Sequence, residues 1–455
     1  MLNRILKKSE NNKNFRNIVK LISGTMMGQI ISFVTLPIIT RMYGADIIGI
    51  WAIVTAISAV FNAVSDVGLS KSIMLEDNDY LLDTYNVVST ISFFSSFLLG
   101  CGTFAYFYFF PSIDNLPAII MGLLIGVYSW LAKQVDICYT WLNREQKYRI
   151  LMRNPVINQL AIAAVSICLG LMGFTKYGYY IGFISGTFFT IVNMKSNLPI
   201  KTFTLKISKF ERAFNVHKNF IIFQTPADLF GQIKNTLPIF LLKEVYGSTA
   251  VGYYSISIKL LNAPVNLLGM SVGRVFYSEL GRLKRDGQVI SKFIEKNVNL
   301  ALKTATPIFM TIFAFGDVFA TTFLGKDWYV AGEMLRIMCF MSMFTFVALS
   351  TQCICIVIGK QKYTLAYSVA QIVMGIFSFV GIGMLFESLL LSIAAYMVSV
   401  VLIQIVYYSF IYKAVRLRII NYLKHVVMNI SIIILGAAIL RLIAMQFSIV
   451  NTILL

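Results

Sequence analysis

Apolar runs of about twenty residues recur along almost the whole chain, and a helix of that length crosses the hydrocarbon core of a bilayer. We expect twelve such spans, at 18–40, 47–70, 84–110, 116–140, 155–174, 177–194, 219–242, 249–275, 298–324, 332–358, 364–386 and 389–412. Only 13% of the residues are charged, whereas soluble domains carry about a quarter. The sequence therefore predicts an all-α, polytopic membrane protein with twelve core transmembrane helices.

One stretch of the sequence occurs twice. Residues Gly28–Trp51 and Gly231–Tyr254 align at a constant offset, which places Tyr43-Gly44 on Tyr246-Gly247. Each copy reads as an apolar helix, a Tyr-Gly turn and a second apolar helix, and glycine would allow positive φ in the turn. Six spans separate the copies, so both enter the membrane from the same side. We therefore predict two parallel-repeat bundles of six helices, with a central cleft between them as the natural site.

The rest of the chain lies between and after these bundles. The predicted domains are an N-terminal bundle at 1–194, a cytoplasmic basic linker at 195–218, a C-terminal bundle at 219–412, and a basic connection with an extra hydrophobic segment at 413–455. Arg441 interrupts the last apolar stretch, 425–455, which is either one more crossing plus a tail or an end lying on the membrane surface. The connection Glu279–Asn297 has apolar residues at helical spacing among charges, which predicts an amphipathic helix on the cytoplasmic face.

Lysine and arginine are concentrated in the N-terminal tail and in alternate connections. The other connections hold only a few, such as Arg41 and Lys176. This distribution predicts a cytoplasmic N-terminus. It also accounts for the net charge of +19 without nucleic acid as a partner. The one exception is the loop after the second span, where Lys71 is followed by four acidic residues, Glu76, Asp77, Asp79 and Asp83.

Charged residues inside the spans are the candidate functional groups. A lysine at the centre of a membrane helix costs ~3 kcal/mol when it faces lipid, so Lys133, Lys234 and Lys259 must face a wet cavity or pair inside the bundle. Lys133 can pair with Asp136 one turn away, and a buried structural pair explains these two as well as a functional one does. Lys259 has no acid within a turn of its own helix.

From these charges we predict two sets of site residues. The predicted substrate-binding residues are Lys133, Lys234, Lys259 and Arg41, of which Arg41 is either an outer gate or an interfacial anchor. The predicted ion-coupling residues are Asp136 and Asp228. The sequence contains no HExxH, Walker, GxSxG or kinase-type motif, and we predict no catalytic residue, metal or cofactor. Transport would then use an ion gradient or the substrate's own gradient.

Two segments carry a resemblance to a known family. Residues 17–73, with a proline late in the first helix and the turn Arg41-Met42-Tyr43-Gly44, resemble the opening of Wzx-type lipid-linked oligosaccharide flippases, the O-antigen and capsule translocases of the MOP superfamily. Residues 237–257, LPIFLLKEVYGSTAVGYYSIS, carry the resemblance into the second half. The family has no strict ligand motif, so the site residues above depend on the charge argument.

The resemblance implies a function and partners. It implies flipping of a polyprenyl-diphosphate-linked oligosaccharide from the cytoplasmic to the outer leaflet of a bacterial inner membrane, by alternating access through a cationic cavity. It further implies membrane lipids, a proton or sodium ion, a polysaccharide polymerase and a chain-length regulator as partners. Excess lysine over acid in the spans suits an anionic head group.

Two other functions stay open. A multidrug exporter of the same superfamily would bind cations and would require acids in its cleft. A membrane polysaccharide polymerase or glycosyltransferase would require a large outer loop or a catalytic acid cluster, and neither is visible in the sequence.

Overall fold

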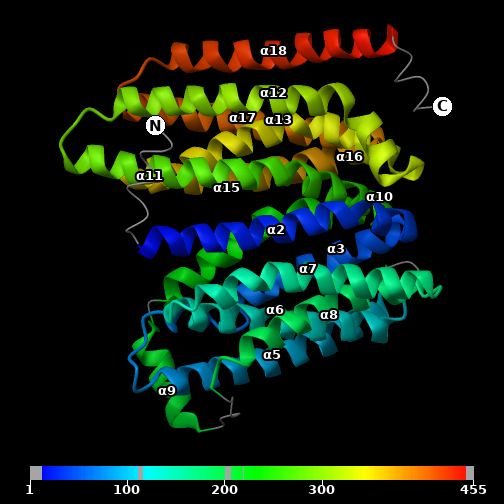
Figure 1. Ribbon diagram of the computed structural model, residues 1–455, viewed down its shortest axis with the longest axis vertical. Helices are drawn as coiled ribbons and strands as arrows, with labels where there is room; N and C mark the ends of the chain where they lie inside the picture. The colour runs from blue at the N-terminus through cyan, green and yellow to red at the C-terminus, as the bar shows by residue number, and fades with distance from the viewer. Residues whose placement is uncertain (1–12, 111–115, 200–205, 219, 447–455) are drawn as a thin grey trace. The chain divides into compact units, whose positions relative to one another are not determined.

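The computed structural model describes residues 13–110, 116–199, 206–218 and 220–446. Helices account for nearly all of these residues, and no strand occurs among them (Figure 1). Ten of the described helices are long and apolar enough to cross a membrane. The predicted all-α, polytopic class is thereby confirmed.

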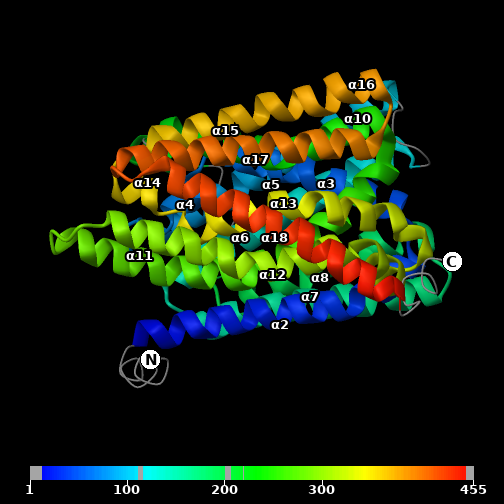
Figure 2. The same cartoon turned by 90° about the horizontal axis from the view of Figure 1, so that it is seen from above.

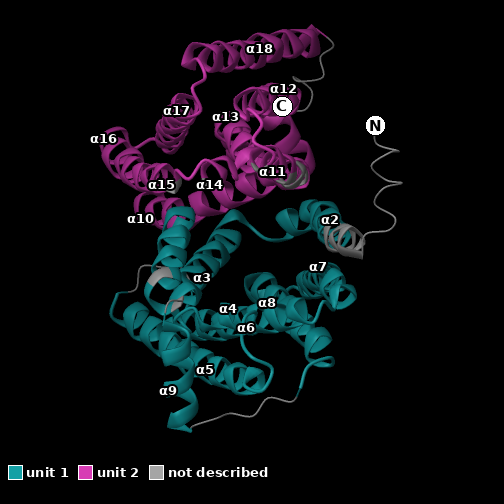
Figure 3. Ribbon diagram, turned by 90° about the vertical axis from the view of Figure 1, so that its left-hand side faces the viewer, with its two compact units in different colours: residues 1–236 teal, residues 237–455 magenta. Residues whose placement is uncertain are grey.

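The chain divides into two compact units, residues 1–236 and 237–455 (Figure 3). In the first unit α5 packs along α6, α7 along α8, and α2 along α7. Its described elements are α2 (Lys13–Met42), α3 (Ala45–Val64), α4 (Leu69–Ser72), α5 (Leu81–Phe109), α6 (Ala118–Arg144), α7 (Tyr148–Leu171), α8 (Thr175–Lys195), α9 (Ile207–Val216), the π-helical turn η1 (Phe220–Gln224) and the first part of α10 (Thr225–Pro264).

In the second unit α12 packs against α13 and α18, and α17 packs against α13 and α15. The described elements are the rest of α10, η2 (Val265–Gly269), α11 (Met270–Arg285), α12 (Ser291–Leu324), η3 (Lys326–Trp328), α13 (Tyr329–Thr351), α14 (Ile354–Val357), α15 (Gln361–Ile376), η4 (Phe377–Ile382), α16 (Gly383–Phe386), α17 (Leu389–Ala414) and α18 (Ile419–Gln446).

The two Tyr-Gly turns differ in backbone conformation. Gly247 lies inside α10 with φ 81° and ψ −178°, so it separates two helical stretches and uses the freedom of glycine. Gly44 has φ −68°, so the expectation of positive φ was wrong there. The tyrosines act alike, because Tyr43 donates to the carbonyl of Ser166 at 2.6 Å and Tyr246 to that of Ser388 at 3.0 Å.

The expected amphipathic helix at 279–297 is not present as a separate element. α11 continues through the start of this stretch to Arg285, and α12 begins at Ser291. Gly287, at φ 66°, ends α11, because its N–H bonds the carbonyl of Lys284 while the N–H of Gln288 bonds that of Leu283. This is a Schellman C-cap, which stops a helix regardless of the apolar periodicity that follows.

The C-terminal hydrophobic segment forms α18, one continuous helix of 28 residues (Figure 2). It is long and apolar enough to cross a membrane, and it packs along α12. Arg441 lies inside it and pairs with Asp317 of α12 at 2.6 Å. Of the two alternatives, these features favour a crossing over an end on the membrane surface.

A small apolar core fixes α4 within the first unit. Leu69 and Ile73, both fully buried, pack with Tyr85 of α5 and with Ile137 and Trp141 of α6. The short α4 could not be stable alone, because a single turn fixes more dihedral angles than it gains hydrogen bonds. Packing therefore holds this segment, and the cavity described next lies beside it.

Candidate functional site: a polar cavity in the first unit

A cavity of about 450 Å³ lies among α3, α4, α6 and the start of α10. It is lined by hydroxyl, amide and charged side chains as well as small residues. Its five charged lining residues are Asp66, Lys71, Lys133, Asp136 and Asp228. Two of the lining helices, α3 and α6, are long and apolar enough to cross a membrane, and charged groups in such helices are candidate functional groups by default.

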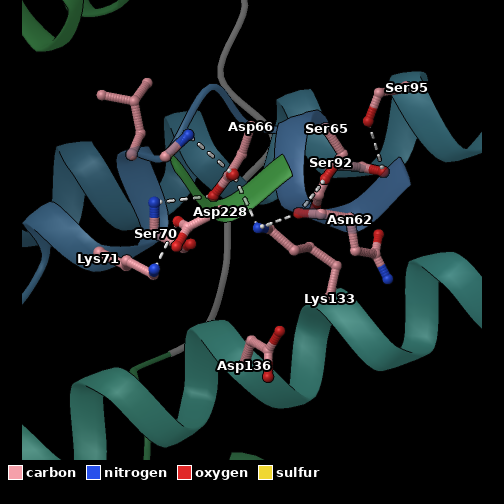
Figure 4. Close-up of polar contacts among 12 residues, drawn as sticks. Asn62, Ser65, Asp66, Ser70, Lys71, Ser92, Ser95, Lys133, Asp136 and Asp228 are labelled. Carbon is pink, nitrogen blue, oxygen red and sulfur yellow. Dashed lines mark hydrogen bonds and ion pairs between the residues drawn. The ribbon is translucent and has the colours of Figure 1, made fainter. Parts of the chain in front are cut away.

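Asp66 organises the turn between α3 and α4. The following residues, Val67 and Gly68, both have positive φ, so the chain reverses sharply after Asp66. The Asp66 carboxylate accepts hydrogen bonds from the N–H groups of Gly68 at 3.2 Å and Ser70 at 2.8 Å (Figure 4). Its side chain is fully buried, so these bonds and an ammonium partner must compensate its charge.

That partner is Lys133 of α6. Its Nζ lies 2.7 Å from Asp66 Oδ1 and also donates to the backbone carbonyl of Asn62 at 3.0 Å. The sequence suggested Asp136 as the partner, but the side chain reaches across to the end of α3 instead (Figure 4). Both side chains of the Lys133–Asp66 pair are buried, so removal of either one would strand an uncompensated charge.

A second ion pair joins α4 to α10. Lys71 Nζ lies 2.5 Å from Asp228 Oδ2, and Gln224 Nε2 donates to Asp228 Oδ1 at 2.9 Å. The Lys71 side chain is 51% exposed and that of Asp228 is 24% exposed, so water reaches this pair. The sequence singled out Asp228 but not Lys71, because 157 residues separate the two and no local pattern links them.

Asp136 is the unbalanced charge of the cavity. Its side chain is exposed toward the cavity, and among the described residues its carboxylate has no hydrogen-bond or ion-pair partner (Figure 4). The cavity lining thus holds one more carboxylate than ammonium groups. The excess of lysine expected from the spans is therefore absent from the lining of this cavity.

The other predicted site residues lie elsewhere. Arg41 is exposed in the last turn of α2, and Lys234 is partly buried in the part of α10 that belongs to the first unit. Lys259 is exposed on α10 in the second unit. None of the three is among the residues that line the cavity.

Sequence reasoning missed a buried carboxylate beside α9. Glu76 accepts hydrogen bonds from Thr84 at 2.5 Å and Arg212 at 3.0 Å, and its Oε2 lies 2.8 Å from His217 Nε2. Burial raises the pKa of Glu76, but the hydrogen bonds from His217, Thr84 and Arg212 outweigh it and lower the pKa to about 2. Glu76 belongs to the acidic loop after α4, and Arg212 and His217 belong to the predicted basic linker 195–218. The acidic loop and the basic linker are therefore joined by an ionic contact.

Sequence reasoning also missed a charge cluster in the second unit. Asp317 of α12 is fully buried and receives Arg441 of α18 through two hydrogen bonds, of 3.1 and 2.6 Å. Arg336 of α13 lies 3.6 Å from the same carboxylate and bonds Glu333 at 2.9 Å. Only the interruption of the last apolar segment by Arg441 signalled this cluster. Within the described part of the chain, no group of three or more His, Cys, Asp or Glu side chains is arranged to hold a metal ion.

Comparison with solved structures shows which known proteins share this fold. The chain is similar to the Lipid II flippase MurJ in an inward closed conformation, with a TM-score of 0.65 and 14% identity, over 92% of this chain and 90% of that one. It is also similar to an inward-facing multidrug resistance MATE family transporter of the MOP superfamily, with a TM-score of 0.57 and 13% identity, over 87% and 94% of the two chains. A MOP superfamily transporter from Pyrococcus furiosus gives a TM-score of 0.52 at 13% identity, over 88% and 95%. The chain therefore shares its fold with these transporters.

A family model described as "Polysaccharide biosynthesis protein" matches residues 38–333. Because this match covers more than half of the chain, the protein belongs to that family. The resemblance carried by residues 17–73 and 237–257 is thereby confirmed. No match was found among curated protein sequences.

Proposed function

We propose that the protein is a flippase that moves polyprenyl-diphosphate-linked oligosaccharide units from the cytoplasmic to the outer leaflet for the assembly of a surface polysaccharide, O-antigen or capsule. The observation that carries the proposal is the charged cavity, which two membrane-length helices, α3 and α6, help to line, in a chain of a polysaccharide biosynthesis family. A diphosphate does not cross hydrocarbon unaided, because burying an unpaired charge is very costly. A polar path for the head group, with the prenyl tail left in lipid, removes that cost.

In the proposed mechanism, cationic side chains bind the substrate during alternating access between the two halves. Lys133, Lys234, Lys259 and Arg41 remain the proposed substrate-binding residues, since ammonium and guanidinium groups form charge-assisted hydrogen bonds to phosphate. Lys133 must exchange Asp66 for the substrate before it can bind a phosphate oxygen. That exchange makes it the least accessible of the four.

Asp136 is the stronger of the two proposed ion-coupling residues. Its carboxylate is unpaired among the described residues and faces the cavity, so a proton or sodium ion would neutralise it directly. Asp228 already has Lys71 and Gln224 as partners and would have to release them first. Intramembrane acids without partners are the usual relay groups of ion-driven transporters.

The proposed setting is the bacterial cytoplasmic (inner) membrane with a cytoplasmic N-terminus. The proposed domains are two six-helix bundles, 1–194 and 219–412, joined by the basic linker 195–218 and followed by the extra segment 413–455, whereas the compact units of the structure divide between residues 236 and 237. No covalent step, cofactor or metal is required. A polysaccharide polymerase and a chain-length regulator would receive the flipped units.

Deletion of the gene tests the proposal. We expect lipid-linked sugar to accumulate in the inner leaflet and surface glycan to disappear, with both restored by the wild-type gene. When the deletion strain expresses Lys259→Ala instead, we expect the variant to be inserted in the membrane but to restore only part of the surface glycan. A deletion strain with normal glycan and no accumulated lipid-linked sugar would refute the flippase function.

One observation favours a second function, that of a cation-coupled multidrug exporter. The cavity lining carries one carboxylate more than ammonium groups, which suits a cationic ligand. Purified protein in sealed vesicles distinguishes the two functions. An exporter would accumulate a cationic dye against an ion gradient, whereas a flippase would move a fluorescent polyprenyl-diphosphate sugar and leave the dye outside.

A further inference from the structure

The two ion pairs of the cavity differ in how readily they can open. Lys133 and Asp66 have side chains only 6% and 0% exposed, and Asp66 also holds the turn to α4. Lys71 and Asp228 are half-exposed and partly exposed, and they come from separate segments of the first unit. An exposed pair contributes little net stability because water competes for both charges. The Lys71–Asp228 pair is therefore the exchangeable one.

Both members of this pair are placed for an exchange. Lys71 follows Ser70, whose N–H is bonded to buried Asp66, so the backbone that carries the ammonium group is fixed. Asp228 keeps a second partner, Gln224, one turn before it in the chain. If Lys71 turned to another anion, Asp228 would remain hydrogen-bonded through Gln224 and accessible to water.

Building on the flippase function proposed above, we propose that Lys71 is an anion-exchange site in which the Asp228 carboxylate occupies the position that a phosphate oxygen of a diphosphate ligand takes. Both groups are oxyanions that accept charge-assisted hydrogen bonds from an ammonium group. The diphosphate carries the larger charge and so competes with the carboxylate. Binding of the diphosphate to Lys71 releases the start of α10 from α4. Ligand binding in the cavity is thereby coupled to movement of α10, the helix that continues into the second unit.

Binding of diphosphate probes to the purified full chain in detergent tests the exchange. The probes are inorganic pyrophosphate and farnesyl diphosphate, measured by titration calorimetry. Asp228→Asn should bind both roughly two- to fivefold more tightly, the range expected when a water-exposed ion pair is released. Lys71→Gln should lose most of the binding, and Lys71→Arg should retain it. Tighter binding of farnesyl diphosphate indicates a lipid-linked ligand, and equal binding indicates a free phosphate.

A double-mutant cycle separates exchange from a general loss of negative charge. In the exchange, Asp228→Asn strengthens binding only when Lys71 is present, so the gain should vanish in a Lys71→Gln background. A gain of equal size in both backgrounds would overturn the proposal, as would binding by Lys71→Gln equal to that of the wild type. Glu145→Gln is the matched control, because it breaks the exposed Lys147–Glu145 pair, 2.6 Å long and outside the cavity, and should change nothing.

The outcome can be told apart from failure of the proposed function. Flipping of a fluorescent polyprenyl-diphosphate sugar is measured in proteoliposomes with the same variants. Flipping by the wild type and equally by Lys71→Gln would leave the flippase function intact and remove Lys71 as the exchange site. An absence of flipping by the wild type would instead refute the function itself.

Discussion

Among the described residues, each unit contains one carboxylate whose side chain is 0% exposed, and the two have different surroundings. Asp66 in the first unit and Asp317 in the second are both 0% exposed, and both are paired with a cation from another helix. Asp66 lines a cavity with hydroxyls, amides and further charges around it. Asp317 lies between α12, α13 and α18, with Arg336 and Arg441 around it.

Full burial is common to both carboxylates, so burial alone does not separate the proposed site from the ion-pair cluster of the second unit. Asp317 holds α18 against α12 through Arg441, which also donates a hydrogen bond to the carbonyl of Ala314 on α12. Asp66 shapes a turn whose next side chains face the cavity. What distinguishes the two is whether polar neighbours remain accessible beside the pair.

The largest effect is expected from breaking the buried pair beside the cavity. Lys133→Met or Asp66→Leu alone should lower the free energy of unfolding by about 3–5 kcal/mol, because each leaves the other charge buried without a partner. The double variant should recover most of that loss while remaining inactive in glycan export. Denaturation in detergent micelles measures the free energy of unfolding. Equal losses of this free energy in the single and double variants would argue against the Lys133–Asp66 pair.

Glu76 is a further buried acid of the first unit, and it lies outside the cavity lining. Its folded pKa, about 2, lies below the ordinary value of 4.5. A depressed carboxyl pKa stabilises the fold above the unfolded pKa, and this contribution is lost as pH falls from about 4.5 to about 2. Glu76→Gln should therefore cost on the order of 3 kcal/mol at pH 7.

The difference in stability between wild type and Glu76→Gln should shrink as the pH falls through that window. Denaturation series at several pH values measure it. Glu145→Gln, in an exposed pair, serves as the control and should cost less than about 1 kcal/mol at every pH. A pH-independent difference for Glu76→Gln would mean that the carboxylate's charge is not what stabilises the segment.

A smaller loss is expected at the buried acid of the second unit. Arg441→Ala should lower stability by about 1.5–3 kcal/mol, the range for hydrogen bonds to a charged group, because Arg336 still compensates Asp317. Surface glycan should persist wherever the protein is inserted. Lys424→Ala, an exposed cation of the same helix, is the matched control. Lost export with unchanged stability would give this cluster a functional role and remove the contrast with Asp66.

The smallest change in stability is expected at Asp136. Its carboxylate has no partner among the described residues, so Asp136→Asn should alter the free energy of unfolding by less than about 0.5 kcal/mol. Transport in vesicles should nevertheless lose its dependence on pH or sodium. A variant that transports with the wild-type dependence would exclude Asp136 as the coupling residue.

The helices and the family could be predicted from the sequence because both depend on local patterns. Apolar runs of membrane length predicted helices that the structure contains, and the duplicated Tyr-Gly stretch placed the break in α10. The termination of α11 was missed, since a Schellman cap at Gly287 depends on one left-handed residue rather than on periodicity. The charges inside two predicted spans also directed attention to Asp136, Asp228 and Lys133, three of the five charged residues of the cavity.

The amino-acid sequence specifies which charged residues the helices carry, whereas the packing of the helices specifies which of those residues form pairs. Lys133 has Asp136 one turn away, yet it pairs with Asp66, because the turn after α3 brings that carboxylate to α6. Lys71 and Asp228 form an ion pair although they are 157 residues apart in the sequence. Helix periodicity is a local property, whereas ion pairing between helices depends on packing, and no spacing within one segment encodes it.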